Sequence, residues 1–86
     1  MHEFSLMKDL MGKITAVAKD NNACRVTRVE VWLGALSHMS GEHFSDHFER
    51  SAKGTLAEGA RLDIQVSTDP ADPQAADVRL LNIDLR

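Results

Sequence analysis

Apolar residues at the start of the chain recur at steps of three and four, which is the spacing of one face of an α-helix. The spacing predicts a helix over residues 3–20, with charged residues such as Lys8, Asp9 and Lys13 on the opposite face. The polar run 20–22 ends it, because short polar side chains compete for backbone hydrogen bonds. The predicted apolar face consists of Phe4, Met7, Leu10, Met11, Ile14, Val17 and Ala18.

Three later segments alternate between apolar and polar residues, which is typical of strands with one buried face. They are residues 25–33, 61–66 and 78–85. In the first segment, the pattern predicts one face of Thr27, Val29, Val31 and Leu33 and an opposite face of Arg28, Glu30 and Trp32. In the last segment, Leu81, Ile83 and Leu85 alternate with Asn82, Asp84 and Arg86.

A second helix is predicted over residues 41–53, where Phe44, Phe48 and Ala52 form an apolar seam. Ser40 is expected to cap its start, because serine readily accepts a hydrogen bond from the first turn of a helix. Gly54 is expected to end it in the left-handed conformation that glycine adopts without strain.

The elements therefore follow the order α-β-α-β-β. Two helices packed on one face of a three-stranded sheet form the simplest two-layer α+β fold with this order. A chain of 86 residues with 43% hydrophobic composition predicts a single domain, residues 1–86, with a small core. Pro70 and Pro73 mark residues 67–77 as a linker before the last strand.

The charge and cysteine content narrow the classes of partner and compartment. A formal net charge of −3 gives no basic footprint for nucleic acid or for an anionic membrane surface. No apolar stretch is long enough to span a bilayer, and the start lacks a basic-then-apolar signal pattern. Cys24 is the only cysteine, so we expect no internal disulfide and a reducing compartment, the cytoplasm.

The sequence contains no recognisable catalytic constellation. It lacks a Ser-His-acid grouping at a typical turn, a phosphate-binding loop and a dinucleotide fingerprint. The carboxylates of Glu30, Asp63 and Asp84 fall on strand faces that we expect to be solvated. We therefore predict that the protein is not an enzyme.

The first three residues, Met1, His2 and Glu3, contain a candidate metal site. The α-amine, a backbone amide and the imidazole of His2 can close fused chelate rings around one ion. Nitrogen ligands in one plane favour Ni(II) or Cu(II) over zinc or magnesium. From these residues alone, the alternative is that His2 is a solvated residue on a frayed terminus.

The predicted second helix carries another candidate metal site. His43 and His47 are four residues apart, so both rings lie on one helix face and can hold one divalent metal between them. Asp46 can add an oxygen ligand. The alternative is a solvated or interface surface, since polar runs on helices are ordinary.

Four blocks of sequence occur in the order and at the spacing that are typical of the HypA/HybF family, and together they resemble that family. They are Met-His-Glu-Phe-Ser-Leu at 1–6, Arg-Val-Thr-Arg-Val at 25–29, Leu-Gly-Ala-Leu-Ser at 33–37 and Gly-Thr-Leu-Ala-Glu-Gly-Ala at 54–60. These proteins deliver nickel during maturation of [NiFe]-hydrogenase and urease. The resemblance implies that Met1, His2 and Glu3 bind Ni(II) through backbone nitrogens and the histidine ring.

The resemblance also marks where this chain departs from its family. Some relatives have an acidic residue near the nickel at position 40, so Ser40 and the nearby His38 are further candidates there. Family members carry a zinc domain with two Cys-x-x-Cys pairs where this chain has residues 67–77, and no such pair exists here. A structural zinc needs four ligands, mostly cysteine. We therefore expect a short form that lacks the zinc domain and binds no zinc.

Two functions of different class follow. The first is a nickel metallochaperone that hands one ion to a HypB-type GTPase, a hydrogenase large subunit or the urease apparatus, which are the partners that the resemblance implies. The second is a non-catalytic interaction or dimerisation module that has lost metal delivery, since edge strands favour homodimers. A metal sensor that uses His43 and His47 is a third possibility.

Overall fold

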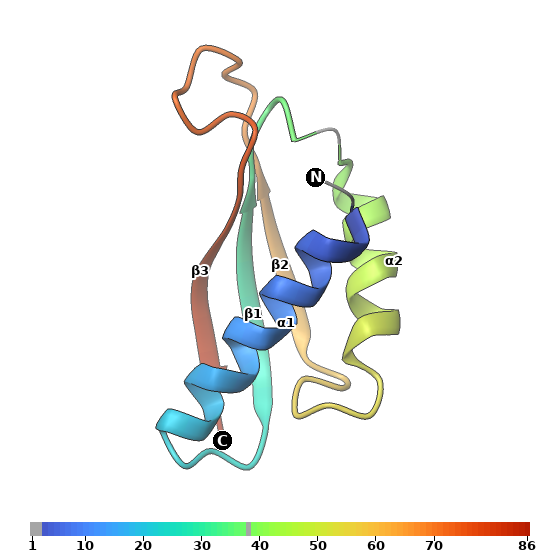
Figure 1. The fold of residues 1–86 in the computed structure, drawn as a ribbon, viewed down its shortest axis with the longest axis vertical. Helices are drawn as coiled ribbons and strands as arrows, with labels where there is room; N and C mark the ends of the chain where they lie inside the picture. The colour runs from blue at the N-terminus through green and yellow to red at the C-terminus, as the bar shows by residue number, and fades with distance from the viewer. Residues whose placement is uncertain (1–2, 38) are drawn as a thin grey trace.

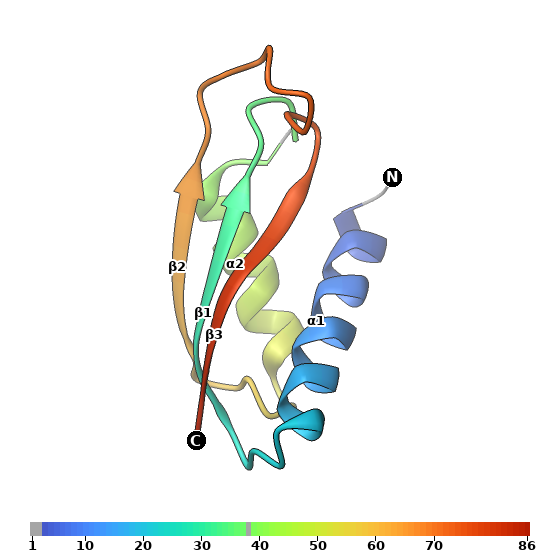
Figure 2. The same cartoon turned by 90° about the vertical axis from the view of Figure 1, so that its left-hand side faces the viewer.

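The computed structural model describes residues 3–37 and 39–86, which form two helices and a three-stranded sheet in the predicted order. The elements are α1 (Glu3–Asp20), β1 (Val26–Leu33), α2 (Gly41–Ala52), β2 (Arg61–Val66) and β3 (Val78–Leu85). The predicted α+β fold class is therefore confirmed. Both helices lie on the same face of the sheet (Figures 1 and 2).

The sheet is mixed, with strand order β2-β1-β3. The central strand β1 pairs in parallel with β2 and antiparallel with β3. The parallel pair requires a crossover, and α2 supplies it. α2 packs against β2 and α1, and α1 also packs against β3, so the helices cover one face of the sheet and leave the other open.

The core lies between the helices and the sheet. Phe44 and Phe48 of α2 are 0% and 1% exposed, and they belong to the same core cluster as Val29 and Val31 of β1, which are fully buried. From α1, Met7, Leu10, Met11, Ile14 and Ala18 are buried as predicted. Val17 is the exception at 36% exposed, because it lies at the edge of the apolar stripe.

The strand faces differ from the simple alternation at two points, and both differences come from irregular pairing between β1 and β3. On β1, Val26 pairs with Leu85 and Arg28 with Asp84, so Thr27 is an extra residue. Val26 is buried and Thr27 is exposed, so the prediction that Thr27 lies on the apolar face was wrong. A bulge of this kind moves every residue beyond it to the other face of the sheet.

The second irregularity is on β3. Glu30 pairs with Asn82 and Val31 with Leu80, so Leu81 is the extra residue. Leu80 packs against the core, whereas Leu81 is 41% exposed on the open face. The prediction that Leu81 shares the apolar face with Ile83 and Leu85 was therefore wrong.

The ends of α2 follow the predicted chemistry. The Ser40 hydroxyl accepts a hydrogen bond from the backbone nitrogen of His43 at 3.1 Å, which is the expected N-cap. The helix ends at Ala52, one residue before the predicted end at 53. Gly54 follows with φ of +78°, in the left-handed region.

The predicted linker 67–77 is a series of tight turns. The side chains of Asp69 and Asp72 accept hydrogen bonds from the backbone nitrogens of Ala71 (3.0 Å) and Gln74 (2.8 Å). Ala75 is 3% exposed and sits against the turn that follows β1. These local bonds explain how a segment with two prolines keeps a defined path to β3.

Candidate metal-binding end

The predicted nickel ligands lie at the start of the chain. Met1 and His2 fall outside the described residues, as does His38, and Glu3 is the first residue of α1. The ligand set Met1, His2 and Glu3 therefore stays a prediction from the sequence.

Several helices and strands start or stop at the same end of the molecule, the one where α1 starts. α2 also starts there, β1 and β2 end there, and residues 67–77 pass over it (Figures 1 and 2). The N-terminal ends of two helices thus share one end of the fold. Because these ends carry partial positive charge, a cation there needs anionic or deprotonated ligands.

Ser40 is exposed at this end, at the cap of α2. Its hydroxyl accepts from the nitrogen of His43, and its carbonyl accepts from the nitrogen of Phe44 at 3.0 Å. The capping role is therefore settled by geometry, whereas a role for Ser40 beside a nickel ion stays a prediction.

His43 and His47 are brought together on α2. Their ring centroids are 5.0 Å apart and the ring planes meet at 28°, so the rings are stacked. His43 is exposed and His47 is half-buried. Within residues 3–37 and 39–86, no three His, Cys, Asp or Glu side chains are grouped so that they can hold a metal ion. The structure thus pairs the two imidazoles without adding Asp46 as a third ligand.

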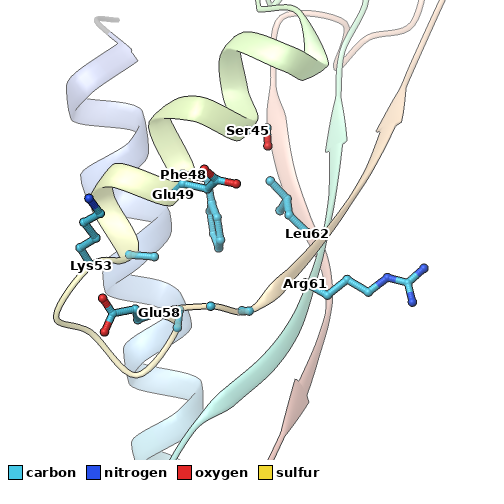
Figure 3. A pocket seen from close by; sticks show the side chains of 11 residues that line it. Ser45, Phe48, Glu49, Lys53, Glu58, Arg61 and Leu62 are labelled. Carbon is cyan, nitrogen blue, oxygen red and sulfur yellow. The ribbon is translucent and has the colours of Figure 1, made fainter.

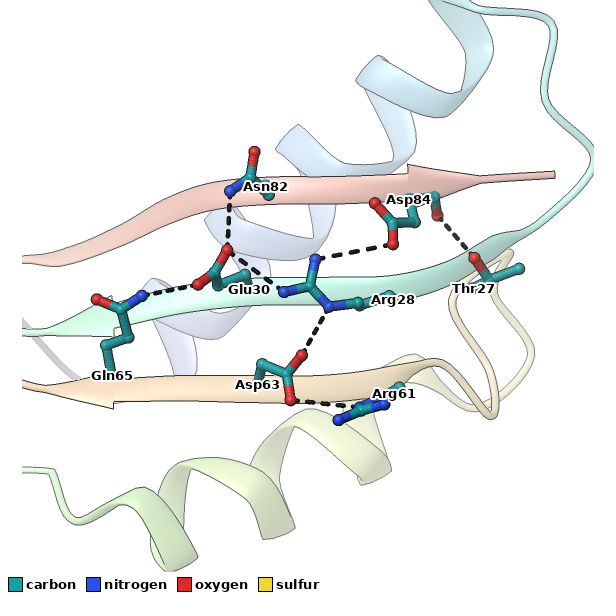
Figure 4. Close-up of polar contacts among 8 residues, drawn as sticks. All are labelled: Thr27, Arg28, Glu30, Arg61, Asp63, Gln65, Asn82 and Asp84. Atoms are coloured by element: carbon teal, nitrogen blue, oxygen red, sulfur yellow. Dashed lines mark hydrogen bonds and ion pairs between the residues drawn. The ribbon is translucent and has the colours of Figure 1, made fainter.

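The open face of the sheet carries a polar network (Figure 4), where the sequence predicted only solvated carboxylates. The Nε of Arg28 donates to Asp63 at 2.6 Å. Its other nitrogens lie 3.4 Å from Glu30 and 3.7 Å from Asp84. One guanidinium therefore connects carboxylates on all three strands of this sheet.

Glu30 is held from both neighbouring strands. Its two carboxylate oxygens accept hydrogen bonds from Asn82 at 2.8 Å and from Gln65 at 2.7 Å. These bonds, with the nearby Arg28, lower the pKa of Glu30 below its ordinary value. The hydrogen bond from Arg28 likewise lowers the pKa of Asp63. Opposite charges two residues apart at Arg28 and Glu30, and again at Arg61 and Asp63, were the sequence signal for this network.

A groove of about 470 Å³ lies between the C-terminal half of α2 and the start of β2 (Figure 3). Its floor is apolar, with Phe48, Ala52 and Leu62, and Glu49 and Lys53 lie along its rim. Of the candidate ligands on α2, none of His43, Asp46 and His47 lines this groove. Among the described residues, the groove is therefore separate from the histidine pair.

Comparison with known proteins identifies the family. A sequence model described as "Hydrogenase/urease nickel incorporation, metallochaperone, hypA" matches residues 1–72. The chain belongs to the HypA family. The match covers most of the chain, and it includes the Met1-His2-Glu3 segment and all of α1, β1, α2 and β2.

Individual HypA proteins agree with this assignment. The chain is 40% identical over 65 residues to hydrogenase maturation factor HypA of Chlorobium limicola, covering 76% of this chain and 56% of that protein. It is 35% identical over 81 residues to HypA of Archaeoglobus fulgidus, covering 94% of this chain and 67% of that protein. The chain thus spans little more than half the length of some HypA relatives that it matches.

Solved HypA structures share the fold. The solution structure of the Ni metallochaperone HypA from Helicobacter pylori superposes with a TM-score of 0.81 at 24% identity, covering 99% of this chain and 97% of that chain. A second solution structure of a HypA protein gives 0.77 at 23% identity, covering 100% and 97%.

In the part of the chain that the structure describes, neither helix combines the length and the apolar character needed to cross a bilayer.

Proposed function

We propose that this chain is a nickel metallochaperone, which binds one Ni(II) ion at Met1, His2 and Glu3 and passes it to a maturing nickel enzyme. The observation that carries the proposal is the match of residues 1–72 to a family described by nickel incorporation. The matched segment begins with the same three residues that the chelate chemistry singles out.

The start of α1 suits a chelate of backbone nitrogens. The first four N–H groups of an α-helix have no intrahelical acceptor. Since α1 begins at Glu3, a backbone amide there can lose its proton to nickel without breaking a helical hydrogen bond. The negative charge of that nitrogen, and of the Glu3 carboxylate, offsets the positive end of the helix dipole.

The same chemistry favours delivery over storage. An α-amine and an imidazole at a chain terminus can leave the ion one at a time, so an acceptor protein can replace them stepwise. The amine and imidazole must be deprotonated to bind, so nickel affinity should fall as the pH is lowered.

The acceptors that we propose are a HypB-type GTPase and the large subunit of a [NiFe]-hydrogenase, or the urease apparatus. Catalysis is not part of this function, and the cytoplasm is its expected location. With Cys24 as the only cysteine, these residues do not supply a structural zinc site. A homodimer through the outer strands stays a prediction, and the alternative of an interaction module without metal delivery has no support from the comparisons.

The proposal is tested by complementation. A strain that lacks its own HypA is supplied with the untagged chain, with His2→Ala, or with Cys24→Ser as a control outside the proposed site. Hydrogenase activity should be restored by the wild type and by Cys24→Ser and lost with His2→Ala at equal protein level. Full activity with His2→Ala would show that delivery does not use this ligand.

A further inference from the structure

The stacked histidine pair on α2 is not used by the proposed N-terminal site. Its two rings lie 5.0 Å apart, centroid to centroid, one helical turn from each other. The helix beneath them is fixed by Phe44 and Phe48, which are 0% and 1% exposed. The capping bond at Ser40 fixes its first turn. The two imidazoles are therefore presented side by side by a well-anchored backbone.

The pair lies on the α1 side of α2. Ser45 and Glu49 line the groove next to β2. Successive residues of a helix are about 100° apart, so His43 and His47 fall on the opposite side of the Phe44–Phe48 seam. α1 packs against α2 and against β3, which lies at the other edge of the sheet from β2, so α1 lies on that side of α2. The pair is thus separated from the groove and lies on the flank that adjoins the helix beginning at Glu3.

Imidazoles at positions i and i+4 of a helix are neighbours, and neutral imidazole is a common ligand for nickel, copper and zinc. We propose that His43 and His47 form a second metal site, which holds one Ni(II) or a similar divalent ion with two imidazole nitrogens and water. The rings are already neighbours, and binding requires that one nitrogen of each ring turns toward the shared ion. This site does not depend on Met1, His2 or Glu3, and it extends the metal chemistry of the chain beyond the proposed delivery site.

The test is a calorimetric nickel titration of the untagged chain in a Cys24→Ser background, because the exposed thiol of Cys24 is itself a metal ligand. The unmodified pair should bind a second equivalent of nickel. His43→Ala should weaken that equivalent by roughly tenfold or more, since one of two protein ligands is lost. His2→Ala should leave it in place.

A spacing control keeps the number of histidines constant. In the double variant His47→Ala with Arg50→His, the two imidazoles are seven residues apart, about 10 Å along the helix. They then cannot share one ion, and the second equivalent should be lost. Circular dichroism confirms that each variant is folded, and His43→Gln replaces His43→Ala if the alanine variant is not.

The possible outcomes separate this site from the N-terminal one. Loss of the second equivalent in His43→Ala and in the spacing control, but not in His2→Ala, supports the proposal. If the wild type binds a single ion and His43→Ala does not change that binding, the proposal is overturned and the N-terminal site is unaffected. Retention of the second equivalent in the spacing control also overturns it. A single ion that is lost in His43→Ala and kept in His2→Ala supports the helix site and contradicts the N-terminal one.

Discussion

Gly34 and Ala75 meet through their backbones, because a Cβ atom on Gly34 would lie only 2.1 Å from the carbonyl oxygen of Ala75. The same oxygen accepts a hydrogen bond from the backbone nitrogen of Leu36 at 2.7 Å, and the backbone nitrogen of Gly34 donates to the carbonyl oxygen of Asp77 at 2.9 Å. The turn after β1 and the segment 67–77 are therefore joined at the end of the molecule where both helices begin.

Gly34→Ala should destabilise the protein by about 1–3 kcal/mol, the usual cost of overpacking a close contact. The clash is with backbone atoms, so a change of side-chain rotamer cannot relieve it. Urea unfolding followed by the fluorescence of Trp32, the single tryptophan, measures the free energy of unfolding.

The matched control is Gly12→Ala in α1, where an added Cβ meets no atom within 4 Å. This change should stabilise the protein by roughly 0.5–1 kcal/mol, because alanine favours the helix over glycine. Equal effects of the two substitutions would show that the Gly34–Ala75 contact is not as tight as the structure has it.

The bulge in β3 predicts different costs for two adjacent leucines. Leu80 packs against the core and Leu81 is 41% exposed. Leu80→Ala should cost about 2 kcal/mol, near the lower end of the range for buried leucines. Leu81→Ala should change stability by less than about 0.5 kcal/mol. If the two costs were reversed, the regular alternation would be right and the bulge wrong.

Because of the polar network on the open face of the sheet, the free energy of unfolding should fall at acidic pH. The pKa values of Glu30 and Asp63 are lower in the folded protein than their ordinary values. Their contribution is therefore present above about pH 4, where the unfolded carboxyls are ionised, and is lost as the pH falls through the depressed folded values. The pKa of Arg28 is raised, so its contribution is lost only in strongly alkaline solution.

Glu30→Gln tests this origin of the acid dependence. Unfolding free energies of wild type and variant should differ at pH 7 and converge as the pH falls below about 4, because the wild type then loses the same charge. Glu49→Gln on the exposed surface of α2 serves as the control. A difference that stays constant from pH 7 to pH 3 would rule out the network as the source.

Ser40 is predicted to act through its cap. Ser40→Ala should cost about 1 kcal/mol, whereas Ser40→Asp should keep the cap, since aspartate accepts the same hydrogen bond. Thermal unfolding of the three proteins measures the difference. Equal losses in alanine and aspartate variants would contradict the capping role of the bond to His43.

The fold could be predicted from the sequence because its helices and strands have strong periodicity. Met7, Leu10 and Ile14 repeat at helical spacing and are buried, and the capping role of Ser40 follows from the residue type alone. The faces of Thr27 and Leu81 could not be predicted, because a bulge depends on the pairing of two strands far apart in the chain. No local pattern marks the extra residue.

The candidate metal ligands on α2 could likewise be predicted only in part. The spacing of His43 and His47 was enough to predict that their rings would be neighbours, as the stacking confirms. Whether Asp46 joins them depends on side-chain directions around the helix, which spacing alone does not fix. The Arg28 network needs three strands brought into register, so the charge pattern within each strand does not by itself predict it.

The measurement that tests the central claim most directly is a nickel titration of the untagged chain followed by visible absorption. The band of planar nickel reports strong ligands, mostly nitrogen, in one plane, and a pair of imidazoles with water does not produce it. One equivalent should generate the band in the wild type. The band should be absent in His2→Ala and in a chain extended before Met1, which removes the α-amine. A planar band that persists in both would contradict nickel binding at Met1, His2 and Glu3.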